Sequence, residues 1–297
     1  MTAGTNVESN AMLSRRHGPI VDDPLPSSTP PLQHAKIYRH SLPVRLSHWM
    51  NVACLFVLIM SGLQIFNAHP ALYWGDRSDR DKPWISMRAM KLDSGEIRGV
   101  TTVAGHAFDT TGWLGYADGM RQGFPNWATL PSQRWLAMGR QWHLFFAWLF
   151  VFNGMLYAVY TLVSRHAVRH LLPTGQDLAH IPQSIVDHVR LRHPSGEAAT
   201  RYNPLQKIAY CIVLGGLAPL IVLTGVLMSP TIDAAAPWLL SAVGGRQSAR
   251  TLHFIACFAF IGFIAVHVGQ VILTGFVNNL RSMLTGWFTV TDGGKRS

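Results

Sequence analysis

Four histidines lie inside or at the ends of long apolar stretches of the sequence: His48, His143, His253 and His267. An ionisable side chain is expensive to hold in a stretch that spans a membrane, so by default it indicates a functional role. Two imidazoles that face each other from different helices would supply both axial ligands of a six-coordinate b-type haem. That arrangement suits electron transfer because it leaves no open position for a substrate. For one histidine alone, a place at the membrane interface is an equally good explanation.

The spacing of these histidines sorts them into two levels. His253 and His267 are 14 residues apart, which is about 21 Å along a helix at 1.5 Å per residue. At 100° per residue their side chains are only about 40° apart around the helix axis. Because consecutive spans run in opposite directions, His143 would lie level with His253, and His48 level with His267. We therefore expect two b-type haems, one held by each of these pairs.

Three arginines and a glycine fit the same picture. Arg45, Arg140 and Arg250 each precede one of the histidines by three residues, one helical turn toward the surface, where haem propionates would emerge. The alternative is that these arginines simply extend to the membrane surface. Gly62 lies 14 residues after His48 on the same helix face, so the haem at the other level would meet bare backbone there. Helix packing is an equally good reason for this glycine.

The elements that must position these side chains are four nearly uncharged windows, at about 47–66, 140–163, 205–228 and 249–277. Each is long enough to cross a hydrocarbon core of about 30 Å. Hydrophobic residues make up 48% of the chain and charged residues 13%, about half the charged share of a soluble domain. We expect an all-α fold, an integral membrane four-helix bundle in contact with lipid that binds the two haems, with a long outer loop between spans one and two.

The chain divides around these spans. Residues 1–35 predict a disordered cytoplasmic tail, 36–288 the four-span dihaem domain, and 289–297 a second cytoplasmic tail. The outer loop, 67–139, contains five tryptophans, which favour an ordered cap that serves as a docking surface. The inner loop, 164–204, predicts a short surface helix near 183–191.

Positive charge indicates the orientation of the chain. Lysine and arginine gather before span one, in the inner loop and after span four, so by the positive-inside rule both termini face the cytoplasm. The net charge of +10 is explained by this placement, and no nucleic acid partner is expected. The three cysteines form neither CxxC nor CxxCH, which argues against iron–sulfur clusters, zinc and c-type haem.

The stretch Arg45-Leu-Ser-His48-Trp49, the pair Trp142-His143, and the spacing of His253 and His267 resemble the bacterial cytochrome b561/nickel-hydrogenase b-type cytochrome family. The membrane cytochrome subunit of formate dehydrogenase is similar in pattern. The resemblance covers roughly 36–66 and 140–288. It implies the same two histidine pairs and a place in the bacterial inner (cytoplasmic) membrane, which the chain would cross several times.

The resemblance also implies a quinone site. In the formate dehydrogenase subunit a Tyr-Asn-x-x-Gln-Lys stretch contacts quinone, and Tyr202-Asn203-Pro-Leu-Gln206-Lys207 has the same spacing. Asn203 and Gln206 would lie about one helical turn apart and can hydrogen-bond quinone carbonyls. Alternatively, Asn203 is a helix N-cap and Gln206 only faces the interface.

The long loop 67–139 departs from the short-looped relatives and resembles the subgroup paired with molybdopterin-containing oxidoreductases. We therefore expect a dihaem b-type cytochrome subunit that transfers electrons between the membrane quinone pool and a periplasmic oxidoreductase partner. No acid–base constellation for substrate chemistry is found, so we expect a subunit of an oxidoreductase complex.

Three alternatives are weaker. A stand-alone dihaem oxidoreductase that acts at the outer surface on superoxide or ferric chelates would need an exposed haem edge. The capping loop argues against such an edge.

A diiron enzyme would need several histidine boxes, whereas only His166 and His170 form an HxxxH. A transporter using polar residues such as Asn153 and Gln270 would be expected to show inverted repeats, which are not evident.

Overall fold

The structure is a computed structural model that describes residues 35–164, 174–179, 181–189 and 204–290. The predicted N-terminal tail up to residue 34, most of the inner loop and the last seven residues lie outside this part of the chain. Asn203 and the histidines of the HxxxH lie outside it as well.

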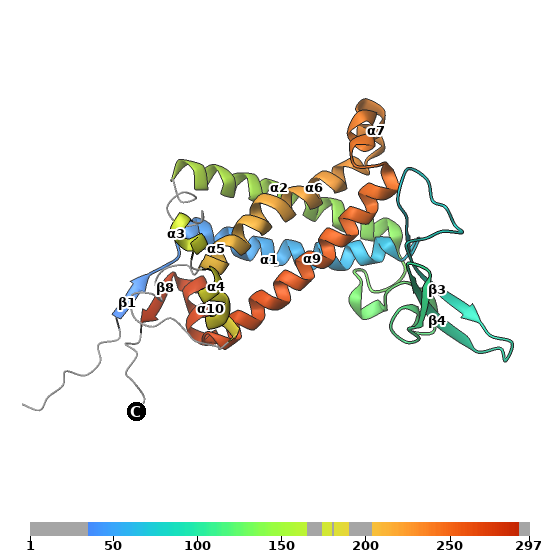
Figure 1. The fold of residues 1–297 in the computed structure, drawn as a ribbon, viewed down its shortest axis with the longest axis horizontal. Coiled ribbons are helices and arrows are strands. Elements are labelled where there is room, and N and C mark those ends of the chain that lie inside the picture. Colours follow the sequence, from blue (N-terminus) through green and yellow to red (C-terminus); the bar gives the residue numbers. More distant parts are fainter. Residues whose placement is uncertain (1–34, 165–173, 180, 190–203, 291–297) are drawn as a thin grey trace, which may run out of the picture. The chain divides into compact units, whose positions relative to one another are not determined.

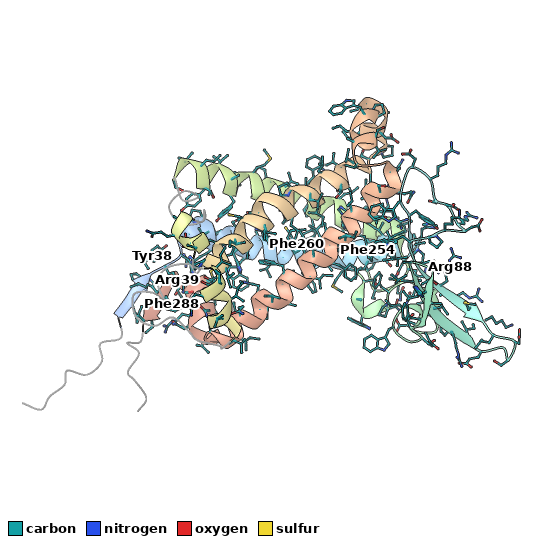
Figure 2. All side chains as sticks on the ribbon, viewed as in Figure 1. Tyr38, Arg39, Arg88, Phe254, Phe260 and Phe288 are labelled. Carbon is teal, nitrogen blue, oxygen red and sulfur yellow. The ribbon has the colours of Figure 1, made fainter. Side chains whose placement is uncertain are left out.

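Four long apolar helical segments form the part of the chain that crosses the membrane, which confirms the four predicted spans. They are α1 (Leu42–Phe66), α2 (Leu136–Val163), the segment Pro204–Leu227 and α9 (Arg246–Leu273). Each has the length and composition needed to cross a bilayer. Figure 2 shows side chains projecting outward along their length. On α2 most of these apolar side chains are exposed, as lipid-facing residues must be. The chain is therefore a multi-pass membrane protein.

The third span contains a π-helical turn in its middle. It consists of α5 (Pro204–Tyr210), a π-helical turn, η4 (Cys211–Leu217), and α6 (Ala218–Leu227). Pro219 follows the π-helical turn and has no N–H to donate to the preceding turn of the helix. A π-helical turn accommodates such a defect without ending the helix, so the span continues.

The predicted fourth span runs a few residues too far. It was expected over 249–277, but α9 ends at Leu273 and the chain turns at Gly275. Gly275 has φ of +104°, a left-handed conformation that glycine adopts without strain. From there the chain continues into α10 (Phe276–Thr285). A sequence window cannot find this change of direction because the residues on both sides of it remain apolar.

The all-α prediction is wrong for the outer loop, which forms β-strands (Figure 1). The larger sheet is antiparallel with strand order β2-β3-β4-β5, and β6 pairs with β7. Two hairpins turn on pairs of residues with positive φ, Ala104-Gly105 and Asp118-Gly119, the geometry of tight hairpin turns. The strand bounds are β2 (Ala71–Leu72), β3 (Ile85–Lys91), β4 (Ile97–Val103), β5 (His106–Asp109), β6 (Gly115–Ala117) and β7 (Met120–Gln122), with a short 3-10 helix η1 (Asn126–Ala128) after them.

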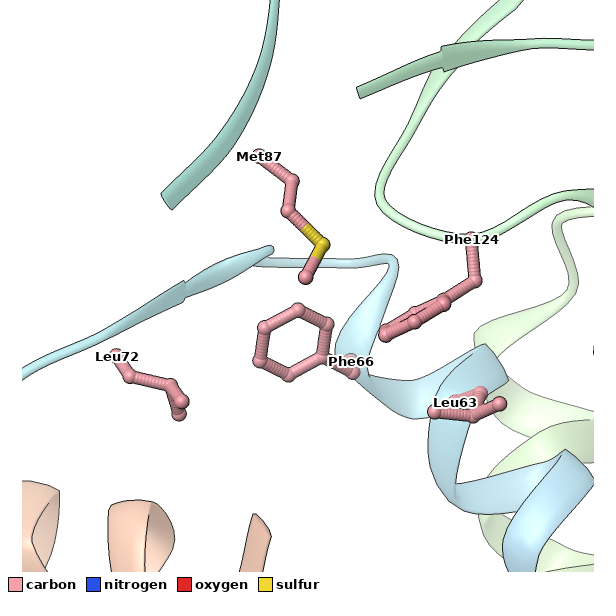
Figure 3. Close-up of a cluster of buried hydrophobic side chains, with 5 residues drawn as sticks. All are labelled: Leu63, Phe66, Leu72, Met87 and Phe124. Atoms are coloured by element: carbon pink, nitrogen blue, oxygen red, sulfur yellow. The ribbon is translucent and has the colours of Figure 1, made fainter. Parts of the chain in front are cut away.

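A small hydrophobic core joins this outer sheet to the end of the first span (Figure 3). Its members come from the last turn of α1, from β2 and β3, and from the segment after β7: Leu63, Phe66, Leu72, Met87 and Phe124. Phe254 of α9 packs against the same cluster. Just beyond α1, the buried Asn67 side chain accepts a hydrogen bond from Phe124 N at 2.7 Å and donates one to Phe124 O at 3.0 Å. The sheet is therefore fixed to the outer ends of α1 and α9.

The opposite end of the bundle is closed by a two-stranded antiparallel sheet. In it β1 (Ala35–Tyr38) pairs with β8 (Trp287–Val290), directly after α10. Residues 35, 289 and 290, which the sequence assigned to the tails, belong to this sheet. Nearby are α3 (Gly175–Ala179) and α4 (Ile181–Val189), which overlaps the predicted surface helix. At the other end, α7 (Pro230–Ala235) and α8 (Pro237–Ala242) connect spans three and four.

Candidate functional site

The four histidines form two pairs, and both pairs include a side chain of α9. His143 of α2 faces His253, with ring centres 6.2 Å apart. His48 of α1 faces His267, with ring centres 6.3 Å apart. These are the pairs that the spacing along the sequence indicates. Each brings together residues from two different spans.

The separation within each pair fits an intervening metal ion. An imidazole nitrogen binds a transition metal at about 2.0–2.1 Å, so two imidazoles that bind one ion from opposite sides have ring centres roughly 6 Å apart. Both measured separations match this geometry. At this distance the imidazoles of a pair are too far apart to stack closely.

The outer pair, His143 and His253, is held at one nitrogen of each ring. His143 Nδ1 lies 3.1 Å from Ser61 Oγ, and this hydroxyl donates its own proton to Val57 O at 2.6 Å. Because the hydroxyl proton of Ser61 is already used, Ser61 Oγ accepts a hydrogen bond from His143 Nδ1–H, which leaves Nε2 able to bind a metal.

His253 is held in the same way. Its Nδ1 lies 3.0 Å from the Ile221 carbonyl and 3.2 Å from Thr224 Oγ1. Nδ1 is again the donor, which again leaves Nε2 able to bind a metal. Metal-binding histidines commonly have their other nitrogen fixed by such a partner, which sets the tautomer and the ring orientation.

A glycine lies beside each outer histidine. A Cβ on Gly62 would come within 3.3 Å of His143 Cε1, and one on Gly225 within 3.2 Å of His253 Cε1. The sequence singled out Gly62 as bare backbone for the haem at the outer level. The structure places it at that level, against the imidazole ring.

Two spans therefore present one pattern to the outer histidines, and sequence reasoning missed most of it. In α1 it runs from Leu58 to Ser61-Gly62, and in α6 from Ile221 to Thr224-Gly225. The signal that would have found it is this repeat. In both spans a hydroxyl residue follows an aliphatic residue by three positions, and a glycine comes directly after the hydroxyl residue.

The inner pair has a different environment. His48 Nδ1 is buried and has no hydrogen-bond partner among the described residues. The Trp49 ring meets the His48 ring edge-on at 5.3 Å, and Trp49 Nε1 donates to Met283 O at 3.1 Å. Phe263 stacks on His267 at 5.8 Å. An aromatic side chain thus contacts each inner histidine.

The three arginines are placed differently from one another. Arg45 donates to Leu284 O at 2.7 Å, while its buried Nε has no partner among the described residues. Arg250 donates to the carbonyls of His69 and Ala71 at 2.5 and 3.0 Å, and so links α9 to the outer sheet. Arg140 is exposed on α2. Their predicted role at haem propionates stays a prediction.

At the inner mouth of span three the structure describes Gln206 but not Asn203. The neighbouring Lys207 donates to Asp177 of α3 at 2.7 Å, in a partly buried ion pair. The hydrogen bond from Lys207, together with those from Thr174, lowers the pKa of the Asp177 carboxyl to about 2. This pair fixes α3 beside the mouth of the span.

The donor set fits b-type haem better than a bare metal ion. Each level offers two facing imidazoles, the pair of protein ligands that a six-coordinate b-type haem would take, and the outer level has both Nδ1 atoms fixed. Within the described residues no group of three or more His, Cys, Asp or Glu side chains is placed to hold a metal ion. A bare ion bound only by protein needs more ligands than one such pair supplies.

The profile of the prokaryotic cytochrome b561 family matches residues 39–286, which include all four spans and the outer sheet. The chain belongs to this family. It is therefore a membrane cytochrome b, a haem protein of electron transport.

The chain is similar to the putative protein-methionine-sulfoxide reductase subunit YedZ1 of Azospira oryzae. The two are 25% identical over 235 residues, which cover 77% of this chain and 88% of the relative. No solved structure gave a significant match.

Proposed function

We propose that the chain is a dihaem subunit that carries electrons across the inner membrane between the quinone pool and a periplasmic oxidoreductase. His143 and His253 would hold the outer haem, and His48 and His267 the inner one. When bound, each haem supplies reversible one-electron transfer at an iron without an open position. The observation that carries the proposal is the pair of facing imidazoles at each of two levels of α9, 6.2 and 6.3 Å apart.

The protein between the two levels supports this role. Ala256 and Phe260 lie on the face of α9 between His253 and His267, and both are almost fully buried. Phe260 is halfway along, about 10 Å from each histidine at 1.5 Å per residue. Dry, close-packed side chains there exclude water and keep the two histidine pairs at a fixed separation.

We place the quinone site at the cytoplasmic mouth of span three. Gln206 and Asn203 would hydrogen-bond the quinone carbonyls near the inner histidines. The ion pair between Lys207 and Asp177 supports this site, because it positions the first turn of the span. Both chain termini would then face the cytoplasm.

We place the oxidoreductase partner on the outer sheet. The relative from Azospira oryzae is named as a subunit of a methionine sulfoxide reductase, and the resemblance of the sequence to partners of molybdopterin enzymes favours that class. Trp74, Trp113 and Trp127 are each at least half exposed on this side, and tryptophan is enriched at the centres of protein interfaces. A free-standing reductase is less favoured, because the hydrophobic core of the sheet packs over the outer ends of α1 and α9.

The haem content of three single variants tests the proposal. We expect the purified protein to bind two b-type haems by its reduced-minus-oxidised spectrum and pyridine haemochrome, and His48→Ala and His143→Ala to lose one each. The matched control is His106→Ala, an exposed histidine of β5, which should keep both. A folded wild-type protein with no haem, or full haem content in both variants, would overturn the assignment.

A further inference from the structure

Each outer histidine is hydrogen-bonded to a hydroxyl group that already donates its own proton to a backbone carbonyl. Ser61 Oγ donates to Val57 O at 2.6 Å, and Thr224 Oγ1 donates to Leu220 O at 2.7 Å. A hydroxyl has one proton to donate and two lone pairs to accept with. Toward His143 and His253 both oxygens therefore act as acceptors of the Nδ1 proton.

Satisfying the hydroxyls themselves does not explain these contacts. A serine or threonine in a membrane helix meets its need by donating to the carbonyl four residues earlier, as both of these do. Ser61 and Thr224 are both fully buried, at 0% exposure. In a medium of low polarity an added hydrogen bond to an imidazole is stronger than in water.

The inner level has no such acceptor at His48. Its Nδ1 is buried without a hydrogen-bond partner in the part of the chain that the structure describes. His48 thus differs from both outer histidines in this respect. Two hydroxyls and the Ile221 carbonyl accept hydrogen bonds from the outer imidazoles, whereas the described residues offer no acceptor to His48 Nδ1.

We propose that Ser61 and Thr224 are positioning residues that lower the midpoint potential of the outer haem below that of the inner one; this rests on the proposed function. An acceptor at Nδ1–H makes the imidazole a more basic ligand. A more basic ligand stabilises the oxidised iron more than the reduced iron, since the oxidised iron carries one more positive charge. Hydrogen bonding around the iron is one of the protein's means of setting a haem potential.

A redox titration followed by haem absorbance tests this inference in the double variant Ser61→Ala/Thr224→Val. The step that vanishes in His143→Ala identifies the outer haem. At a fixed applied potential near its midpoint, we expect the ratio of reduced to oxidised outer haem to rise about tenfold in the double variant. That ratio corresponds to about 59 mV for a one-electron couple. The inner step should not move, and the low-spin ferric signal of the outer haem in electron paramagnetic resonance should change.

Two controls separate chemistry from packing. Thr224→Ser keeps the hydroxyl and should keep the wild-type potential. Thr161→Val removes a buried hydroxyl of α2 that donates to Tyr157 O, and it should move neither step. If the double variant loses haem, the comparison of Thr224→Val with Thr224→Ser decides, and equal potentials in these two would overturn the inference.

The outcomes also separate the two proposals. Two haems in the wild type with unchanged potentials in the double variant would overturn the role of the hydroxyls and leave the haem assignment standing. A wild-type outer step that lies above the inner one would overturn the order of potentials. Fewer than two haems in the wild type would overturn the proposed function itself.

Discussion

At the scale of single residues, the outer histidines occupy spaces whose size is set by two glycines. Gly62 and Gly225 allow the imidazoles of His143 and His253 to lie against helix backbone. Any side chain at either glycine would have to displace a ring whose nitrogen is already hydrogen-bonded. The glycines and the hydroxyls therefore fix each ring from two directions.

Gly225→Ala tests this restriction. The added methyl group would lie about 3.2 Å from His253 Cε1, and overpacking of this kind costs about 1–3 kcal/mol. We expect a lower content of the outer haem and normal inner haem, measured from the spectrum of purified protein. Gly262→Ala on α9, where a Cβ meets nothing within 4 Å, is the matched control. Equal spectra for the two variants would show that the close approach of His253 to Gly225 does not affect haem binding.

The sequence predicted the histidine pairs but not the residues that hold them. Pairing follows from depth, because helix rise and the alternating direction of spans fix the level of each residue. Ser61 and Thr224 were missed because a hydroxyl in a span normally satisfies itself within its own helix. Only the structure shows that these oxygens also reach an imidazole of another span.

At the scale of elements, the outer sheet shows where sequence patterning failed. The segment was expected to be an ordered cap, but its strands were not predicted: four of the six have only two to four residues, too few to show an alternating pattern. The dipeptide Asp118-Gly119 was a readable hairpin signal, and both residues have positive φ. Ala104-Gly105 makes the same kind of turn without a typical turn residue in first place.

Asn67 makes a testable link between this sheet and span one. Asn67→Ala would remove both hydrogen bonds to the Phe124 backbone, those at its N–H and at its carbonyl. Each buried group left without a hydrogen bond costs about 1–3 kcal/mol. We expect faster proteolysis of the outer segment, with both haems retained. The matched control, Ser94→Ala in the exposed turn between β3 and β4, should be cleaved at the wild-type rate. Identical cleavage of both variants would contradict the role of Asn67.

The link between α3 and span three should depend on pH. The folded-state pKa of Asp177 is about 2, against an ordinary value of 3.8. A lowered carboxyl pKa gives stability that is present above the ordinary value and lost as the pH falls through the folded value. At pH 6 we expect Asp177→Asn to be less stable by about 1 kcal/mol or less, as is usual for ion pairs near a surface.

Thermal unfolding of detergent-solubilised protein measures this effect. The difference between wild type and Asp177→Asn should shrink as the pH is lowered from about 4 toward 2. Asp93→Asn, an exposed carboxyl in the turn after β3, should show no such trend. A difference that stays constant down to pH 2 would exclude the ion pair as its source.

At the scale of the whole molecule, spans one and four are joined at both ends. On one side β1 pairs with β8. On the other, Thr251 of α9 donates to Tyr73 O at 2.6 Å, and Gly75 N donates to Ser248 Oγ at 2.8 Å. The first and last described segments, β1 and β8, therefore lie on one side of the membrane, and the outer sheet lies on the other.

Thiol labelling of intact cells tests this topology. In a variant without native cysteines, we expect Ser94→Cys in the outer sheet to react with a membrane-impermeant reagent. Thr285→Cys, exposed at the end of α10, should react only after the cells are opened. Labelling of Thr285→Cys in intact cells would place the termini on the periplasmic side and overturn the proposed orientation.

Because α9 supplies one member of each histidine pair, neither pair can form until the last span is in the membrane. Spans one and two would enter the membrane with His48 and His143 unpaired, and the partners of both arrive with the last span. Haem delivery would therefore follow the release of the chain from the ribosome. A chain truncated anywhere before α9 would lack both histidine pairs and so, under the proposed function, would bind neither haem.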